Sequence, residues 1–143
     1  MIYLLLTAAL AAADLVLKHR AEQDPRTPIV KNTGFSFGVL KGKPAVVRGI
    51  PLLSSVVFGI LWAMALGRKG GEGEKLSLSL IMAGAISNVY DRLKRGYVVD
   101  YINLKNPKKE QPGRIYYNLA DLYVVTGALT GFLDMVRTAL RLW

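Results

Sequence analysis

The chain has 143 residues, of which 52% are hydrophobic, and it carries a formal net charge of +9. Long uncharged runs favour a single membrane domain over residues 1–143 and disfavour a soluble domain. There is no cysteine and only one histidine, which excludes disulfides and multi-histidine metal sites within one chain, so catalysis would rest on carboxylates, amides, hydroxyls, Lys or Arg without a cofactor.

The first apolar run, residues 1–17, predicts a membrane-spanning helix. A cleaved signal peptide is the alternative, although no Lys or Arg precedes the apolar core. Asp14 and Lys18 are one helical turn apart and therefore share a face. Their spacing is typical of an ion pair at the membrane interface, and it would also suit a pair that supports a polar site at the end of the helix.

Residues 19–45 are polar and rich in Pro and Gly, which predicts a loop with short extended pieces. Within it, Asn32-Thr33-Gly34 predicts a turn. Phe35 and Phe37 then alternate with Ser36, as in a short strand or an interfacial anchor.

Residues 49–66 predict a second span with Pro51 in its first turn, where Pro is tolerated. Residues 67–75 predict a flexible charged loop, and residues 76–92 a third span. The third span carries small residues that suit tight packing between membrane helices: Ser77, Ser79, Ala83, Gly84 and Ser87. Helical spacing puts three polar residues on one face at its end: Asn88, Asp91 and Arg92.

After the third span, Gly96 permits a turn, and residues 98–102 predict an extended segment with Asp100 in its middle. Residues 103–114 predict a loop and residues 115–136 a fourth span, in which Gly127 and Gly131 form a small-x-x-x-small pair for helix packing. Near its start, Asn118 and Asp121 fit a helix cap and an acidic first turn.

Short loops make the four predicted spans antiparallel neighbours in an all-α membrane protein. One membrane face then collects the ends of the first and third spans and the starts of the second and fourth. Ionisable groups at a membrane span indicate a functional site. Two neighbouring carboxylates, Asp100 and Asp121, cannot both ionise comfortably, so they would share a proton. Such a pair could activate water and protonate a leaving amine, which is peptide hydrolysis without a metal.

Four motifs in the chain resemble, in order, those of the prolipoprotein signal peptidases (signal peptidase II), the membrane aspartyl proteases of bacteria. They are Asp14-x-x-x-Lys18, Asn32-Thr-Gly34-x-x-Phe37, Asn88-x-x-Asp91-Arg92-x-x-x-Gly96-x-Val-Val-Asp100-Tyr, and Asn118-x-Ala120-Asp121. The third motif is long and specific, and together the four cover most of the chain.

The resemblance implies four transmembrane helices, both termini in the cytoplasm, and a small extracytoplasmic β-element. It implies an enzyme of the bacterial inner membrane that removes signal peptides from lipid-modified prolipoproteins, cleaving before the diacylglyceryl-modified cysteine, and that is inhibited by globomycin. We expect the protein to be a monomer. Asp100 and Asp121 match the family's catalytic pair. The family's substrate contacts match Asn32, Gly34, Asn88, Arg92 and Asn118. Its supporting residues match Asp14, Lys18, Asp91 and Ala120.

The chain departs from the family pattern at Leu15, where Gln is usual, and in the short stretch 19–31. The charge balance is also unusual, because only five of the nineteen Lys and Arg residues fall on the implied cytoplasmic side: Arg68, Lys69, Lys75, Arg137 and Arg141. This reverses the positive-inside rule. We expect the outer basic residues to meet anionic lipid headgroups, and we expect no nucleic-acid partner.

Two other functions remain open at the level of sequence. The first is a non-catalytic relative that binds lipoproteins or peptides in the same groove. The second is a small channel or transporter with an Asp-based proton path, although the polar residues cluster at one face and do not cross the midplane.

Overall fold

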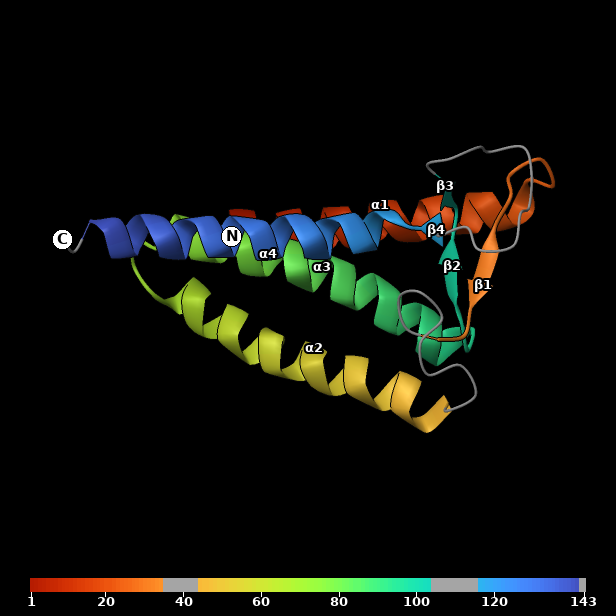
Figure 1. Ribbon diagram of the computed structural model, residues 1–143, viewed down its shortest axis with the longest axis horizontal. Coiled ribbons are helices and arrows are strands. Elements are labelled where there is room, and N and C mark those ends of the chain that lie inside the picture. The colour runs from red at the N-terminus through yellow and green to blue at the C-terminus, as the bar shows by residue number, and fades with distance from the viewer. Residues whose placement is uncertain (35–43, 104–115, 142–143) are drawn as a thin grey trace.

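Four long helices form the body of the molecule, and short strands lie across one end of them (Figure 1). The computed structural model describes residues 1–34, 44–103 and 116–141. The helices are α1 (Ile2–Gln23), α2 (Pro44–Gly67), α3 (Glu72–Lys94) and α4 (Leu119–Leu140). The start of α1 and the end of α4 lie toward the end away from the strands, and consecutive helices run antiparallel (Figure 1).

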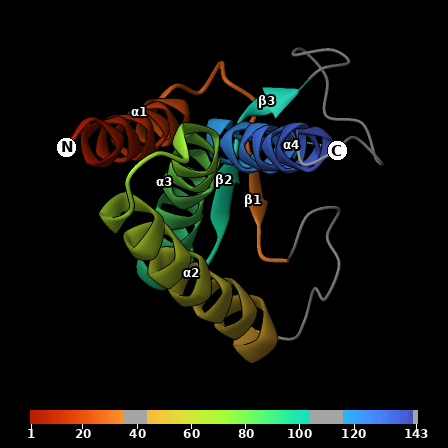
Figure 2. The ribbon, with the colours of Figure 1, turned by 90° about the vertical axis from the view of Figure 1, so that its left-hand side faces the viewer.

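α3 is the central helix and packs against α1, α2 and α4 (Figure 2). All five small residues expected at its packing faces are buried or nearly so: Ser77, Ser79, Ala83, Gly84 and Ser87. The prediction for Gly127 is also confirmed, since a Cβ there would lie 2.7 Å from the backbone oxygen of Ser77. Small residues therefore let α3 and α4 approach closely.

In the described part of the chain, three helices are long and apolar enough to cross a membrane: Ile2–Gln23, Ala45–Gly67 and Leu119–Leu140. α3 does not meet this criterion. It carries acidic residues in its first turn, basic residues in its last turn and buried serines between them. Its polar side chains face the other helices, which explains how a polar helix occupies the centre of an apolar bundle.

Several predicted boundaries were wrong. α1 continues to Gln23, where residues 19–23 were expected to be loop. α3 begins at Glu72, so the loop expected over 67–75 is shorter. α4 begins only at Leu119, because Asn118 caps it and the two preceding residues form a strand.

Pro51 lies inside α2 and not in its first turn, because α2 already begins at Pro44. A proline in a helix cannot donate its backbone hydrogen bond. Ser55 adds a local bond, since its hydroxyl donates to the Pro51 carbonyl oxygen at 2.6 Å. Membrane helices tolerate such interruptions when nearby side chains satisfy backbone groups.

The described strands form two small antiparallel pairs. β1 (Val30–Asn32) pairs with β2 (Val98–Asp100), with Val30 opposite Asp100. β3 (Ile102–Asn103) pairs with β4 (Tyr116–Tyr117), with Ile102 opposite Tyr117. The extended segment expected around Asp100 is thus confirmed, with Gly96 at a φ of 82° in the turn before it. The extended piece expected at Phe35–Phe37 lies outside the described residues.

The contact at Gly84 gives a first testable prediction. A Cβ there would lie 2.3 Å from the backbone oxygen of Ala120 and 2.7 Å from a methyl group of Val124. Because a backbone atom cannot rotate away, we expect Gly84→Ala to lower the free energy of unfolding by about 1–3 kcal/mol. Unfolding in detergent micelles measures this.

Gly59→Ala is the matched control, because a Cβ at Gly59 would meet only the Met82 methyl group at 3.6 Å, an ordinary contact. Equal stability of the two alanine variants would contradict the close approach of α3 and α4.

Candidate active site

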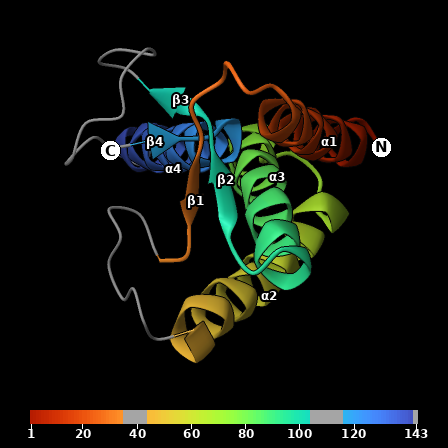
Figure 3. The same ribbon diagram turned by 90° about the vertical axis from the view of Figure 1, so that its right-hand side faces the viewer.

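Two acidic side chains from different elements meet at the strand end of the bundle. Asp100 is the last residue of β2 and is 3% exposed, and Asp121 lies in the first turn of α4 and is half-buried. Figure 3 looks at this end and shows β2 passing between α3 and the start of α4. The fold therefore brings the predicted carboxylate pair to one place.

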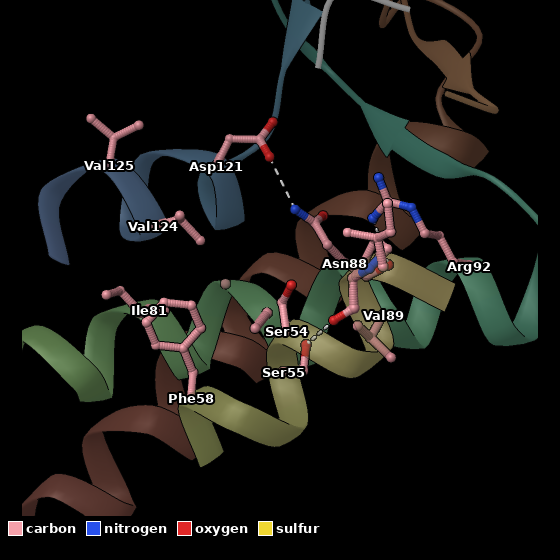
Figure 4. A pocket seen from close by; sticks show the side chains of 14 residues that line it. Ser54, Ser55, Phe58, Ile81, Asn88, Val89, Arg92, Asp121, Val124 and Val125 are labelled. Atoms are coloured by element: carbon pink, nitrogen blue, oxygen red, sulfur yellow. Dashed lines mark hydrogen bonds between the residues drawn. The ribbon is translucent and has the colours of Figure 1, made fainter. Parts of the chain in front are cut away.

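Each of the two carboxylates accepts hydrogen bonds from asparagine amides. Asp100 accepts from Asn32 Nδ2 at 3.0 Å and from Asn118 Nδ2 at 2.7 Å. Asp121 accepts from Asn88 Nδ2 at 3.0 Å (Figure 4). These donors are neutral, so they orient the carboxylates without cancelling their charge.

Asn118 links the two carboxylate residues through hydrogen bonds to both of them. Its Oδ1 accepts from the backbone N–H of Asp121 at 2.9 Å, and its backbone N–H donates to Asp121 Oδ2 at 3.3 Å, which makes a capping box. Its Nδ2 donates at the same time to Asp100. The prediction that Asn118 caps the helix is confirmed, and the same side chain contacts Asp100.

Burial and the neighbouring Asp121 carboxylate raise the pKa of Asp100 to about 7. The hydrogen bonds from Asn32 and Asn118 act in the opposite direction, because they favour the ionised form. Asp100 therefore keeps its proton up to near-neutral pH. A pair in which one carboxyl is protonated can supply both an acid and a base.

The side chain of Lys18 is a buried cation close to the carboxylate pair. Lys18 is fully buried, and its Nζ lies 2.8 Å from Asp14 Oδ2 and 3.2 Å from Asp91 Oδ2. It also donates to Asn88 Oδ1 at 2.8 Å, which leaves Asn88 Nδ2 pointing at Asp121. The ion pair expected from the spacing of Asp14 and Lys18 is thus confirmed, and both side chains are buried inside the bundle.

Arg92 and Asp91 leave α3 in different directions. Arg92 donates to the backbone oxygens of Asn88 and Gly34, each at 3.3 Å, and so holds the segment after β1. Gly34 N–H also donates to Asn32 Oδ1 at 2.9 Å, which is the predicted Asn-Thr-Gly turn. Asp91 accepts from Val99 N–H at 3.2 Å and so fixes β2. Ala120 is fully buried against Gly84.

The sequence analysis missed three residues that support this site: Ser87, Arg95 and Tyr101. The Ser87 hydroxyl donates to Asp14 Oδ2 at 2.5 Å. The Tyr101 hydroxyl donates to Asp14 Oδ1 at 3.0 Å, and burial raises the pKa of Tyr101 above its usual value, so it stays a donor. The only sequence signal was position, since Tyr101 follows Asp100 and Arg95 lies one turn after Asp91.

A pocket of about 310 Å³ opens beside Asp121 between α2, α3 and α4 (Figure 4). Its polar end is formed by Asn88, Arg92 and Asp121. The rest of its lining is mainly apolar and includes Phe58, Ile81, Val124 and Val125. Asp121, one member of the carboxylate pair, thus lies at the polar end of a groove that suits an apolar chain.

The fold and the site together define a small integral membrane protein with two neighbouring carboxyl groups at one end of a helical bundle. The chain belongs to the signal peptidase II family, because the family profile described as "Signal peptidase (SPase) II" matches residues 6–137.

Relatives named "Lipoprotein signal peptidase" share about a third of the aligned residues. The protein of Clostridium acetobutylicum is 36% identical over 104 residues, which cover 70% of this chain and 62% of that protein. The protein of Caldicellulosiruptor bescii is 33% identical over 100 residues, which cover 70% and 59%. The matched stretch thus spans about three fifths of these relatives' lengths.

The fold is also similar to solved structures. One described as a bacterial membrane enzyme aligns with a TM-score of 0.76 at 19% identity, covering 96% of this chain and 89% of that one. A second with the same description aligns with a TM-score of 0.71 at 20% identity. At this identity the likeness concerns the fold alone.

Proposed function

We propose that this protein is an aspartic endopeptidase that removes signal peptides from bacterial prolipoproteins, cleaving before the diacylglyceryl-modified cysteine. One observation carries the proposal: Asn118 joins Asp100 to Asp121, and Asp121 lies at the polar end of an apolar groove. The family membership and the name that its relatives carry support the substrate class.

In the proposed reaction one carboxyl is ionised and the other is protonated. The ionised carboxylate takes a proton from a water molecule as the water oxygen adds to the scissile carbonyl carbon. The protonated carboxyl, Asp100 by virtue of its burial, gives its proton so that the carbon–nitrogen bond breaks and the amine leaves. One water is consumed, and a carboxylic acid and an amine are released.

The remaining residues of the site bind or support. Substrate backbone and carbonyl groups would contact the residues that match the family's substrate contacts, of which Asn88 and Arg92 line the groove: Asn32, Gly34, Asn88, Arg92 and Asn118. The groove between α2 and α4 would hold apolar parts of the substrate, and a globomycin-type cyclic peptide would compete there. Asp14, Lys18, Asp91 and Ala120 would support the pair without touching substrate.

The proposed topology makes α3 the fourth membrane crossing and places both termini in the cytoplasm of a monomer. The strand end with the carboxylate pair then faces the extracytoplasmic side of the inner membrane, where secreted precursors arrive. Many basic residues lie on that side, and α1 and α3 end there. Cations at a helix C-terminus complement the helix dipole, and cations at the membrane surface bind anionic headgroups. Protease cleavage of the 67–75 loop from outside intact cells would contradict this orientation.

The pH dependence of cleavage follows from Asp100. Its proton is present below the folded-state pKa of about 7 and is lost above it. Since the proton is needed for the leaving amine, we expect kcat/KM to fall as the pH rises past about 7. Asn32→Ala removes a hydrogen bond that favours the ionised form, so the fall should move to higher pH. A wild-type rate that keeps rising well above pH 7 would contradict the assignment of the acid.

The proposed function is tested with the purified protein in detergent and a diacylglyceryl-modified prolipoprotein peptide. We expect cleavage before the modified cysteine, inhibition by globomycin, and little cleavage of the same peptide without its lipid. A folded protein that binds globomycin and does not cleave would indicate a binding protein. pH-dependent ion flux in liposomes without proteolysis would indicate a channel.

A further inference from the structure

Arg95 is a charged residue next to the site that the mechanism above does not use. It follows the end of α3, one helical turn after Asp91, so the two side chains share a face. Its Nη1 donates to Asp91 Oδ1, and its Nη2 lies 3.3 Å from Glu22 Oε2 of α1. The Arg95 side chain is only 19% exposed, so water screens this contact weakly.

Asp91 is shared between two cations. It is fully buried, with Oδ1 on Arg95 and Oδ2 at 3.2 Å from Lys18 Nζ. Lys18 in turn contacts Asp14 Oδ2 at 2.8 Å. The cluster of Asp14, Asp91, Lys18 and Arg95 therefore has two negative and two positive charges. Without Arg95 the buried part of this cluster would carry a net negative charge.

This four-residue cluster reaches both members of the carboxylate pair. Val99, whose N–H donates to Asp91 Oδ2, is the residue before Asp100. Lys18 Nζ donates to Asn88 Oδ1 at 2.8 Å, and Asn88 Nδ2 donates to Asp121 at 3.0 Å. Val99 thus separates the cluster from Asp100, and the Asn88 amide separates it from Asp121. Charges act over such distances in a buried region.

We infer that Arg95 is a positioning residue whose charge neutralises Asp91, leaves the charge of Lys18 to act on the pair, and so sets the pH range of the reaction. The inference rests on the proposed function, because it concerns the same carboxylates. Arg95 acts through Asp91 and Lys18 and contacts neither Asp100 nor Asp121 directly.

The other charged and titratable groups near the cluster and the pair come from α1, α3, α4 and the strand region: Glu22, Arg92, Tyr97, Tyr101 and Tyr123. Tyr97 and Tyr101 donate as neutral hydroxyls to Glu22 and Asp14, so they add no charge. Glu22 is 21% exposed, lies at the outer edge and holds the Arg95 side chain in place. Arg92 lines the groove and interacts electrostatically with Asp121, Asp100 and Asp91, and its charge is present in wild type and in the Arg95 variants alike.

The sign of the effect follows from charge. Arg95→Gln makes the cluster more negative and so disfavours an ionised carboxylate in the pair. The rising limb and the falling limb of the plot of kcat/KM against pH should both move to higher pH by about half a pH unit or more. Arg95→Lys keeps the charge and should restore the wild-type limbs. A purely structural role for Arg95 would lower the rate or the melting temperature and leave the limbs in place.

The experiment measures kcat/KM against pH for the lipid-modified peptide with wild type, Arg95→Gln and Arg95→Lys. Arg68→Gln is the matched control, because Arg68 pairs with Glu74 at 3.0 Å at the opposite end of the bundle and is largely exposed. The pH profile of Arg68→Gln should match that of wild type. Should Arg95→Gln fail to fold, Glu22→Gln removes the outer partner and leaves the Arg95 charge unopposed there, so the limbs should move to lower pH. Unmoved limbs in the folded variants would overturn the inference.

A second readout separates this inference from the proposed function. Infrared difference spectroscopy follows the protonated-carboxyl band during a pH titration of the intact protein, and Asp100→Asn identifies its band. A band that titrates at higher pH in Arg95→Gln supports the inference even if the wild type cleaves nothing. A band that titrates as in wild type overturns it, whatever the cleavage assay shows.

Discussion

Asp100→Asn and Asp121→Asn are each expected to lower kcat for lipoprotein-peptide cleavage by about 10⁴-fold or more while the protein stays folded. An amide cannot take a proton from water or donate one to a leaving amine. Each substitution therefore removes one of the two groups that the proposed reaction needs. Asn has nearly the same shape as Asp, and its Oδ1 still accepts the hydrogen bond from Asn118 at position 100 or from Asn88 at position 121.

The stability of these variants separates chemistry from folding. Burial raises the pKa of Asp100 above its unfolded-state value, so the ionised side chain opposes folding above pH 7. Asp100→Asn removes that penalty, and at alkaline pH the variant should unfold at a temperature no lower than wild type. Asp134→Asn is the matched control, because Asp134 lies on the same helix as Asp121 and contacts Gly73 at the far end of α3. Cleavage by Asp121→Asn at near the wild-type rate would rule out the pair.

Lys18→Met is expected to cost about 3–5 kcal/mol of unfolding free energy, the largest stability effect of any single substitution in the site. Methionine fills a similar volume, so the loss does not come from a cavity. It comes from Asp14 and Asp91, both fully buried, which lose the cation that lies 2.8 Å and 3.2 Å from them. Unfolding in detergent micelles at neutral pH measures the change.

Lys75→Met is the matched control for this prediction. Lys75 is also nearly buried and lies 3.2 Å from a carboxylate, but that carboxylate belongs to Glu72 and is 66% exposed. Water can solvate Glu72 when its partner is gone, so the expected cost is about 1 kcal/mol or less. The double variant Lys18→Met/Asp14→Asn should recover part of the loss because it removes one of the stranded carboxylates. Equal costs for the two lysines would contradict the buried cluster.

The location of the site could be predicted because polar residues stand at the ends of apolar runs and short loops fix which ends meet. Asn32, Asn88, Asp100, Asn118 and Asp121 were expected together for that reason, and their hydrogen bonds confirm it. The family motifs then distinguished the two acidic residues of the pair from the supporting ones.

Side-chain direction across helices could not be predicted in the same way. Spacing within α1 paired Lys18 with Asp14, but its contacts to Asn88 and Asp91 depend on how α1 rotates against α3. The role of Tyr101 depends on a hydroxyl reaching from the strand region back to α1. Helix ends were misplaced where tertiary contacts extend or cap a helix, as at Gln23 and Asn118.

The polar character of α3 has a consequence for how the chain is made. Each Asp or Arg within a span costs about 2.5–3.5 kcal/mol when a helix partitions into lipid alone. α3 carries Asp91 and Arg92 in its last turn and serines along its length, so it gains little from lipid. Its packing requires α4, which follows it in the chain, and Asn118 at the start of α4 donates to Asn88 near the end of α3. During biosynthesis the central helix therefore depends on a helix that is made after it, and the two carboxylates come together only once the start of α4 has been synthesised.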